Sequence, residues 1–168
     1  MASLYGSGDD PEKFLPALVR ALREERPFRM TAGAQLREWL HIDDALRAMF
    51  LALDSPAPPE VCAVNIGTGD GITLRDLALR VCQLMGASPS LLQIGALPYR
   101  GHEVHHLVMN VERQARLLGF VPQWDLEAGL SRFLGHDAAP QASHDGEPRL
   151  PEYPLPRAPA ARLGARSA

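Results

Sequence analysis

Apolar residues recur at the three- and four-residue spacing of an amphipathic helix in two segments of the chain. The first segment covers residues 14–22 and follows a run of turn-forming residues at 4–11. The second covers residues 74–84, and Thr73 before it supplies a hydroxyl that can cap a helix. The pattern therefore predicts a turn that leads into a first helix, and a capped helix near the middle of the chain.

Short apolar runs bounded by Gly, Pro and polar residues indicate strands. They occur at residues 28–30, at 61–66, at 91–97 and in the segment that ends with Trp39, Leu40 and Ile42. Asp43 and Asp44 are natural N-cap residues before a helix at 45–53, and shorter helices are predicted at 111–118 and 126–134. Alternating strands and helices predict an α/β fold.

The predicted strands are too few for a complete doubly wound sheet, so we expect an incomplete Rossmann-type fold in residues 1–135. Residues 136–168 are rich in Pro, Ala and Arg. Such a segment cannot bury enough apolar area to offset its ordering entropy, which predicts a disordered tail.

The composition is that of an ordinary globular protein, with 46% apolar residues and a formal net charge of -3. This charge gives no reason to expect nucleic acid or an anionic membrane as a partner, and Lys13 is the only lysine. No apolar stretch approaches membrane-spanning length and the first residues do not resemble a secretion signal, so we expect a cytoplasmic protein. Cys62 and Cys82 are expected to be buried and reduced.

A glycine-rich turn at residues 67–71 lies between a predicted strand and a predicted helix, the context in which such turns hold a dinucleotide. The spacing does not fit, because the third glycine of the fingerprint would fall on Ile72. No acidic residue follows at the expected distance either. We therefore interpret the segment as a structural turn and assign no cofactor-binding residue to it.

The residues His102, Glu103 and His106 match the His-Glu-x-x-His pattern of zinc hydrolases, in which the glutamate is the general base. That pattern requires a helix, whereas Val104, His106 and Val108 alternate as they would in a strand. A strand would separate the two histidines too far for one metal ion. We favour a polar loop and strand edge, and we predict no metal ligand.

Two arginines stand close to carboxylates, Arg37 beside Glu38 and Arg100 three residues before Glu103. Guanidinium suits a diphosphate because its planar donors bind two oxygens at once and it stays charged. Composition alone favours solvated ion pairs over a ligand site. Both interpretations stay open on these residues.

Four segments occur in a characteristic order along residues 4–134: LYGSGDDPEKFLPALVRAL, TAGAQLREWLHIDDALRAMFLAL, AVNIGTGDGITLRDLA and PYRGHEVHHLVMNVERQARLLGFVP. The series resembles the C-terminal half of the extended short-chain dehydrogenase/reductase family, specifically the NAD-dependent nucleotide-sugar epimerases and dehydratases. The resemblance covers nearly all of the foldable chain and implies a site for a nucleotide diphosphate sugar.

The resemblance implies a role for each matching residue. Gln35 and Arg37 match a family segment that supplies an arginine to the diphosphate, with Glu38 where the family has Asp. Arg100 and Glu103 resemble a later segment that gives a second phosphate arginine and a carboxylate for the ribose hydroxyls.

Two further substrate contacts are implied. Tyr5 matches a tyrosine in a turn near the sugar and the nicotinamide, and Met30 falls where relatives stack an aromatic ring on the base. The flexible thioether of Met30 would replace that ring.

The resemblance implies NAD or NADP as cofactor, yet the family's Tyr-x-x-x-Lys pair does not occur in this sequence. We assign no catalytic residue and expect the cofactor-binding half to lie outside these residues. The prediction is a substrate-binding portion that is inactive alone, with a separate cofactor-domain chain or a homo-oligomer as possible partner. The alternatives are a noncatalytic partner-binding remnant and, third, the zinc hydrolase.

Overall fold

The computed structural model describes residues 2–55 and 62–136. The predicted tail therefore lies, apart from His136, outside the described residues. The elements in chain order are β1 (Ser3–Tyr5), α1 (Phe14–Arg23), β2 (Phe28–Met30), β3 (Leu36–His41), α2 (Ile42–Asp54), β4 (Gly71–Thr73), α3 (Leu74–Met85), a 3-10 turn (Pro89–Leu91), β5 (Leu92–Ile94), β6 (His106–Leu107), α4 (Glu112–Leu118) and α5 (Leu126–Leu134).

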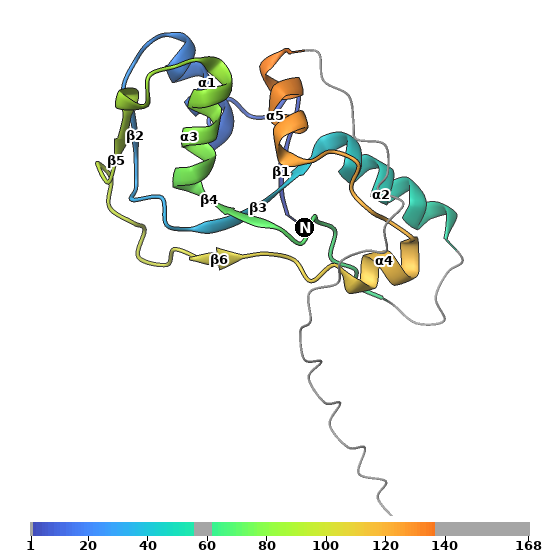
Figure 1. Cartoon of the computed structure of the whole chain (residues 1–168). Coiled ribbons are helices and arrows are strands. Elements are labelled where there is room, and N and C mark those ends of the chain that lie inside the picture. The colour runs from blue at the N-terminus through green and yellow to red at the C-terminus, as the bar shows by residue number, and fades with distance from the viewer. Residues whose placement is uncertain (1, 56–61, 137–168) are drawn as a thin grey trace, which may run out of the picture.

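β3 is the central strand of the larger sheet, and its two halves have different partners (Figure 1). The first half pairs antiparallel with β4 and parallel with β6, so that Arg37 lies opposite Ile72 and Leu107. The second half pairs parallel with β1, with Leu40 opposite Leu4. β2 and β5 form a separate parallel pair. The side chains of β3 are therefore placed where the other strands and their loops converge.

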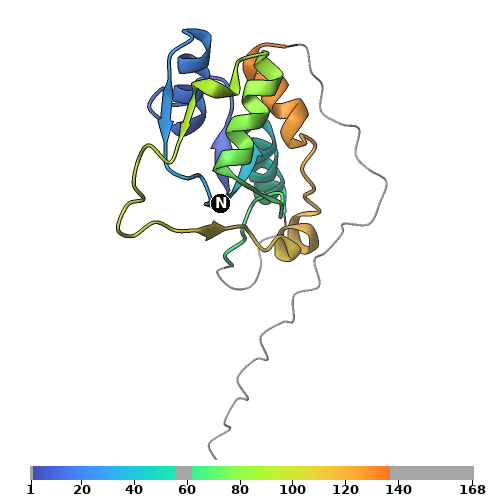
Figure 2. The ribbon, with the colours of Figure 1, turned by 60° about the vertical axis from the view of Figure 1, so that its left-hand side comes forward.

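The main core lies between the helices and the sheet. α3 packs between α1 and α5, and α2 lies on a different side of β1 and β3 (Figures 1 and 2). Leu18 and Leu22 of α1, Leu77 and Val81 of α3 and Leu130 of α5 meet in this core. These positions are the apolar stripes that the helical spacing predicted, since residues three and four apart share one helix face.

Most predicted elements are confirmed. α1, α3, α4 and α5 form at the predicted segments, and so do β2 and a shorter version of the strand at 91–97. Thr73 caps α3 as expected, because its hydroxyl accepts the Asp76 backbone N–H. The α/β fold class follows from this arrangement. No helix within the described ranges is both long and apolar enough to cross a membrane.

The strand predicted at 61–66 is wrong for residues 62–66, which form no strand, and Cys62 is exposed where burial was expected. The extended pairing falls instead on β4, directly after the glycine-rich turn. Cys82 is buried in α3 as predicted. An apolar run shows that a segment favours burial, but it does not show which neighbour will supply the hydrogen bonds.

The start of the chain and the cap of α2 also differ from the prediction. The sequence predicted a turn from residue 4, but residues 3–5 form β1. α2 is capped by His41, whose Nδ1 accepts the Asp43 N–H, and not by Asp43 or Asp44. Asp44 is buried and accepts the backbone N–H groups of Gln123 and Trp124. This aspartate therefore ties α2 to the loop before α5.

Candidate functional site

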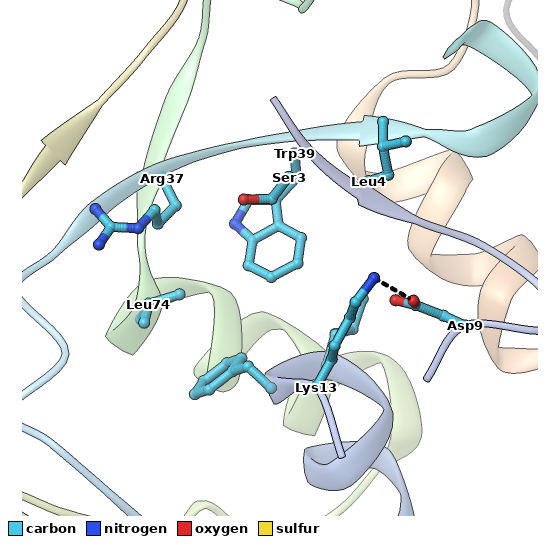
Figure 3. Close-up of a pocket in the computed structure, with 9 residues that line it drawn as sticks. Ser3, Leu4, Asp9, Lys13, Arg37, Trp39 and Leu74 are labelled. Atoms are coloured by element: carbon cyan, nitrogen blue, oxygen red, sulfur yellow. Dashed lines mark hydrogen bonds and ion pairs between the residues drawn. The ribbon is translucent and has the colours of Figure 1, made fainter. Parts of the chain in front are cut away.

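A cavity of about 340 Å³ opens between β1, β3 and the first turns of α1 and α3. Nine residues line it: Ser3, Leu4, Asp9, Lys13, Phe14, Leu15, Arg37, Trp39 and Leu74. Figure 3 shows the cavity with the Arg37 guanidinium at one side of Trp39 and the Lys13–Asp9 pair at the other. Apolar walls with a few charged groups are typical of small-molecule sites.

Arg37 enters the cavity from the first half of β3. Its Nη2 donates to Glu103 Oε1 at 2.9 Å, and its Nη1 donates to the backbone oxygen of Leu36 at 3.1 Å. The side chains of Arg37 and Glu103 are only 15% and 17% exposed. The structure thus joins two predicted site residues that are 66 positions apart in sequence. Arg37 thus pairs with Glu103 and not with the adjacent Glu38, whose carboxylate accepts backbone N–H groups.

Glu38 faces the opposite side of the strand and is buried. Its carboxylate accepts the backbone N–H groups of Thr68, Gly69 and Met109. It therefore holds the glycine-rich turn from inside, in the way that a bound anion would. This contact supports the interpretation of residues 67–71 as a structural turn, because the carboxylate already occupies the N–H donors that a dinucleotide phosphate would need.

Lys13 is a cavity residue that the sequence interpretation did not include. Its ammonium lies 2.6 Å from Asp9 Oδ1, and this contact raises the pKa of the lysine. Lys13 is the N-cap residue of α1. Its position as the only lysine, directly before a predicted helix, was the signal available in the sequence.

Trp39 is the second lining residue that the sequence interpretation passed over. Its indole lies between the two cationic groups in the view of Figure 3. The Nε1 atom is buried, and within the described residues it has no hydrogen-bond partner. Its ring contacts Tyr5 edge-on at 6.4 Å between centroids.

Tyr5, Met30 and Gln35 do not line the cavity. Tyr5 is buried beside His41, and burial raises the pKa of its hydroxyl well above the ordinary value. Met30 belongs to the main core, and Gln35 exchanges hydrogen bonds with Thr31. Their predicted roles as ligand contacts stay predictions.

The segment that matched the zinc pattern forms no helix. β6 begins at His106, residues before it form a turn and irregular chain, and Glu103 is engaged by Arg37. Arg100 lies in the same segment with an exposed side chain. Among the residues that the structure describes, no group of three or more His, Cys, Asp or Glu is arranged to hold a metal ion.

Comparison with known proteins connects this geometry to a family. Residues 1–67 match the sequence model of the NAD dependent epimerase/dehydratase family. The chain is 28% identical to CDP-abequose synthase of Salmonella typhimurium over 134 residues, which cover 78% of this chain and 44% of that protein. It is 34% identical to GDP-L-fucose synthase 1 of Arabidopsis thaliana, over 77% of this chain and 42% of that protein.

Comparison with solved structures points to the same kind of protein. A dTDP-glucose 4,6-dehydratase from Streptomyces venezuelae, with NAD and TYD bound, superposes with a TM-score of 0.72 at 28% identity, over 80% of this chain and 41% of that chain. The fold of the described residues therefore matches part of a Rossmann-like fold. The chain spans less than half the length of each of these relatives. Sequence and structure thus both match this chain to part of the nucleotide-sugar epimerases and dehydratases of the NAD dependent epimerase/dehydratase family.

Proposed function

We propose that this chain is the nucleotide-sugar-binding portion of an NAD-dependent sugar epimerase or dehydratase. The observation that carries the proposal is the Arg37–Glu103 pair at the edge of an apolar cavity. A guanidinium that is shielded from water and held in place by a carboxylate can bind a diphosphate in a fixed orientation.

Arg37 and Glu103 would contact different parts of the ligand because their charges are opposite. Arg37 would donate to the diphosphate oxygens, and the Glu103 carboxylate would accept hydrogen bonds from the ribose hydroxyls. Arg100, three residues before Glu103 and exposed, is proposed as a second phosphate ligand. Relatives of the chain that bind UDP-glucuronic acid or UDP-glucose together with NAD support this substrate class.

The glycine-rich turn at residues 67–71 is a poor fit for NAD. The glycine-rich turn departs from the dinucleotide fingerprint, and Glu38 fills the space that a phosphate would need. The sequence also contains no Tyr-x-x-x-Lys pair. We therefore propose that these residues bind and orient the nucleotide sugar, and that hydride transfer depends on groups outside them. A separate cofactor-domain chain or a second copy of the protein would be the partner.

A thermal-unfolding panel of the full chain with UDP-, CDP-, dTDP- and GDP-sugars tests the proposal. A ligand that binds only the folded state raises the unfolding temperature, and the stabilisation grows with the logarithm of the ratio of ligand concentration to dissociation constant. We expect one base to stabilise the wild type and to leave Arg37→Ala unchanged. Equal stabilisation of both proteins, or of neither, would refute the site.

The runner-up is a noncatalytic partner-binding module, and one observation favours it. Leu46, Met49, Phe50 and Leu53 form an apolar stripe on α2 at helical spacing, between 46% and 80% exposed. Exposed apolar stripes of this kind mark contact surfaces. Stoichiometric binding to a protein partner that Leu53→Glu abolishes, by a chain without nucleotide affinity, would favour this function over the first.

A further inference from the structure

Exposed apolar side chains gather around α2 and α4. Among the residues that the structure describes, nine large apolar side chains are exposed, and six of them belong to α2, α4 or the chain just after α4. Four of the six form the stripe on α2, and the other two are Leu117 and Val121. None of the six belongs to the main core, because α2 lies on a different side of β1 and β3 from α1 and α3 (Figures 1 and 2).

Contacts between α2 and α4 hold these side chains in one surface. Arg47 of α2 donates to the backbone oxygen of Val121, and the Ser55 hydroxyl donates to that of Leu117 at 3.5 Å. The patch exposes on the order of 500 Å² of apolar area, which is large for a monomer. Two such patches packed together would bury about 1,000 Å², the size at which a specific interface begins.

The stripe on α2 is symmetric about its midpoint. Positions 46, 49, 50 and 53 lie at equal distances on either side of the point between Met49 and Phe50. When a second α2 runs antiparallel across the first, Leu46 lies level with Leu53 of the other copy, and Met49 lies level with Phe50 of the other copy. Three- and four-residue spacing is also the seam along which two helices pack. A two-fold dimer requires a surface that is complementary to itself, and this stripe meets that requirement.

Two carboxylates define what this geometry costs. Asp43 and Asp54 are exposed, one at each end of α2. In an antiparallel pair, Asp54 of each copy lies about 3 Å along the helix axis from the level of Asp43 of the other copy. Like charges at a contact reduce affinity, whereas the antiparallel helix dipoles attract one another. The apolar seam therefore favours the dimer, and the two aspartates weaken it.

We propose that this chain forms a two-fold symmetric dimer through α2. The stripe packs antiparallel against the same stripe of a second copy, and Leu117 and Val121 border the contact. None of these residues lines the cavity, so the dimer does not depend on nucleotide-sugar binding.

Sedimentation equilibrium of the full chain tests the dimer. We expect a reversible monomer–dimer equilibrium in wild type that Leu53→Glu weakens at least about a hundredfold, because a loss of about tenfold or more occurs at two places in the dimer. Leu53 is 80% exposed, so the change leaves the fold intact. Leu97→Glu is the matched control, since Leu97 is exposed and lies outside the patch.

A charge reversal tests the antiparallel arrangement. Asp54→Lys should tighten the dimer, because each new ammonium comes close to Asp43 of the other copy. Glu127→Lys changes the charge by the same amount on exposed α5 and should not tighten it. Weaker or unchanged dimerisation of Asp54→Lys would contradict the antiparallel geometry.

Disulfide formation tests the same arrangement directly. In a Cys62→Ser background, Leu46→Cys combined with Leu53→Cys should cross-link two chains, whereas Leu53→Cys alone should not. The two positions are too far apart on one helix to form a disulfide within a chain. A folded chain that is monomeric at every concentration would overturn the proposal, whether or not another protein binds the stripe. A dimer that Leu53→Glu leaves unchanged would overturn it as well.

Discussion

The carboxylate of Glu38 fills the space in which a side chain at position 67 would begin. A Cβ atom added to Gly67 would overlap Glu38 Oε1, and the same oxygen accepts the N–H groups of Thr68 and Gly69. The glycine is therefore required by close approach of an acid to the backbone. A buried glutamate and a glycine-rich turn form one unit that positions β4 against β3.

Replacing Glu38 with Gln should destabilise the protein by about 2–3 kcal/mol, because the amide NH2 can no longer accept the part-buried Met109 N–H and leaves it without a partner. Urea unfolding measures the difference. Glu127→Gln is the matched control, since Glu127 is an exposed partner of Arg80 and should change stability by less than about 0.5 kcal/mol. A Glu38→Gln protein as stable as the control would show that the turn does not depend on the carboxylate.

Gly129→Ala should destabilise the protein even though Ala favours helix. Gly129 lies in α5 and is buried, and a Cβ atom there would overlap the Tyr5 hydroxyl. Helix propensity alone predicts a gain of about 1 kcal/mol, whereas overpacking costs about 1–3 kcal/mol. We expect a net loss in urea unfolding. Combining the change with Tyr5→Phe should restore part of it, and a stabilised Gly129→Ala single variant would contradict the packing.

His41 should make the protein less stable at mildly acidic pH. Burial lowers the pKa of its imidazole below the ordinary 6.5, with Arg132 acting in the same direction and Asp43 and Asp44 opposing. The unfolded chain therefore binds a proton more readily than the folded one as pH falls below 6.5. His41 therefore contributes its full stabilisation above pH 6.5. This contribution is lost as the pH falls toward the lower pKa of the folded state.

His41→Asn isolates this effect, because Asn retains a cap acceptor for the Asp43 N–H but does not titrate. Lowering the pH from about 7.5 to about 5.5 should reduce the unfolding free energy of the wild type more than that of the variant. A difference that stays constant over this range would mean that His41 titrates alike in the folded and unfolded states.

The sequence predicted the helices well and the strands less well. α1 and α3 have long apolar periodicities and Thr73 gives a clear cap, so local pattern was sufficient. β1 and β4 have three residues each, and their existence depends on pairing with β3, which no local pattern contains. The segment at 62–66 is apolar and yet unpaired for the same reason.

Candidate site residues could be named from the sequence, but their arrangement in space could not. Resemblance identified Arg37 and Glu103 separately, and only the fold brings them to 2.9 Å. Glu38 could not be separated from the site by sequence, because adjacent residues of a strand point to opposite faces only once the strand is established. Lys13 was missed because its place in the same cavity lining as Arg37 depends on tertiary packing and not on its local contact with Asp9.

The most direct test of the account is the dissociation constant of the full chain for its preferred nucleotide sugar, measured by calorimetry for wild type and for Arg37→Ala. Arg80→Ala, which removes an exposed arginine that does not line the cavity, is the control. The account predicts one-to-one binding by wild type and control, and a loss of at least about tenfold in Arg37→Ala. No binding by a folded wild type, or equal binding by all three proteins, would contradict it.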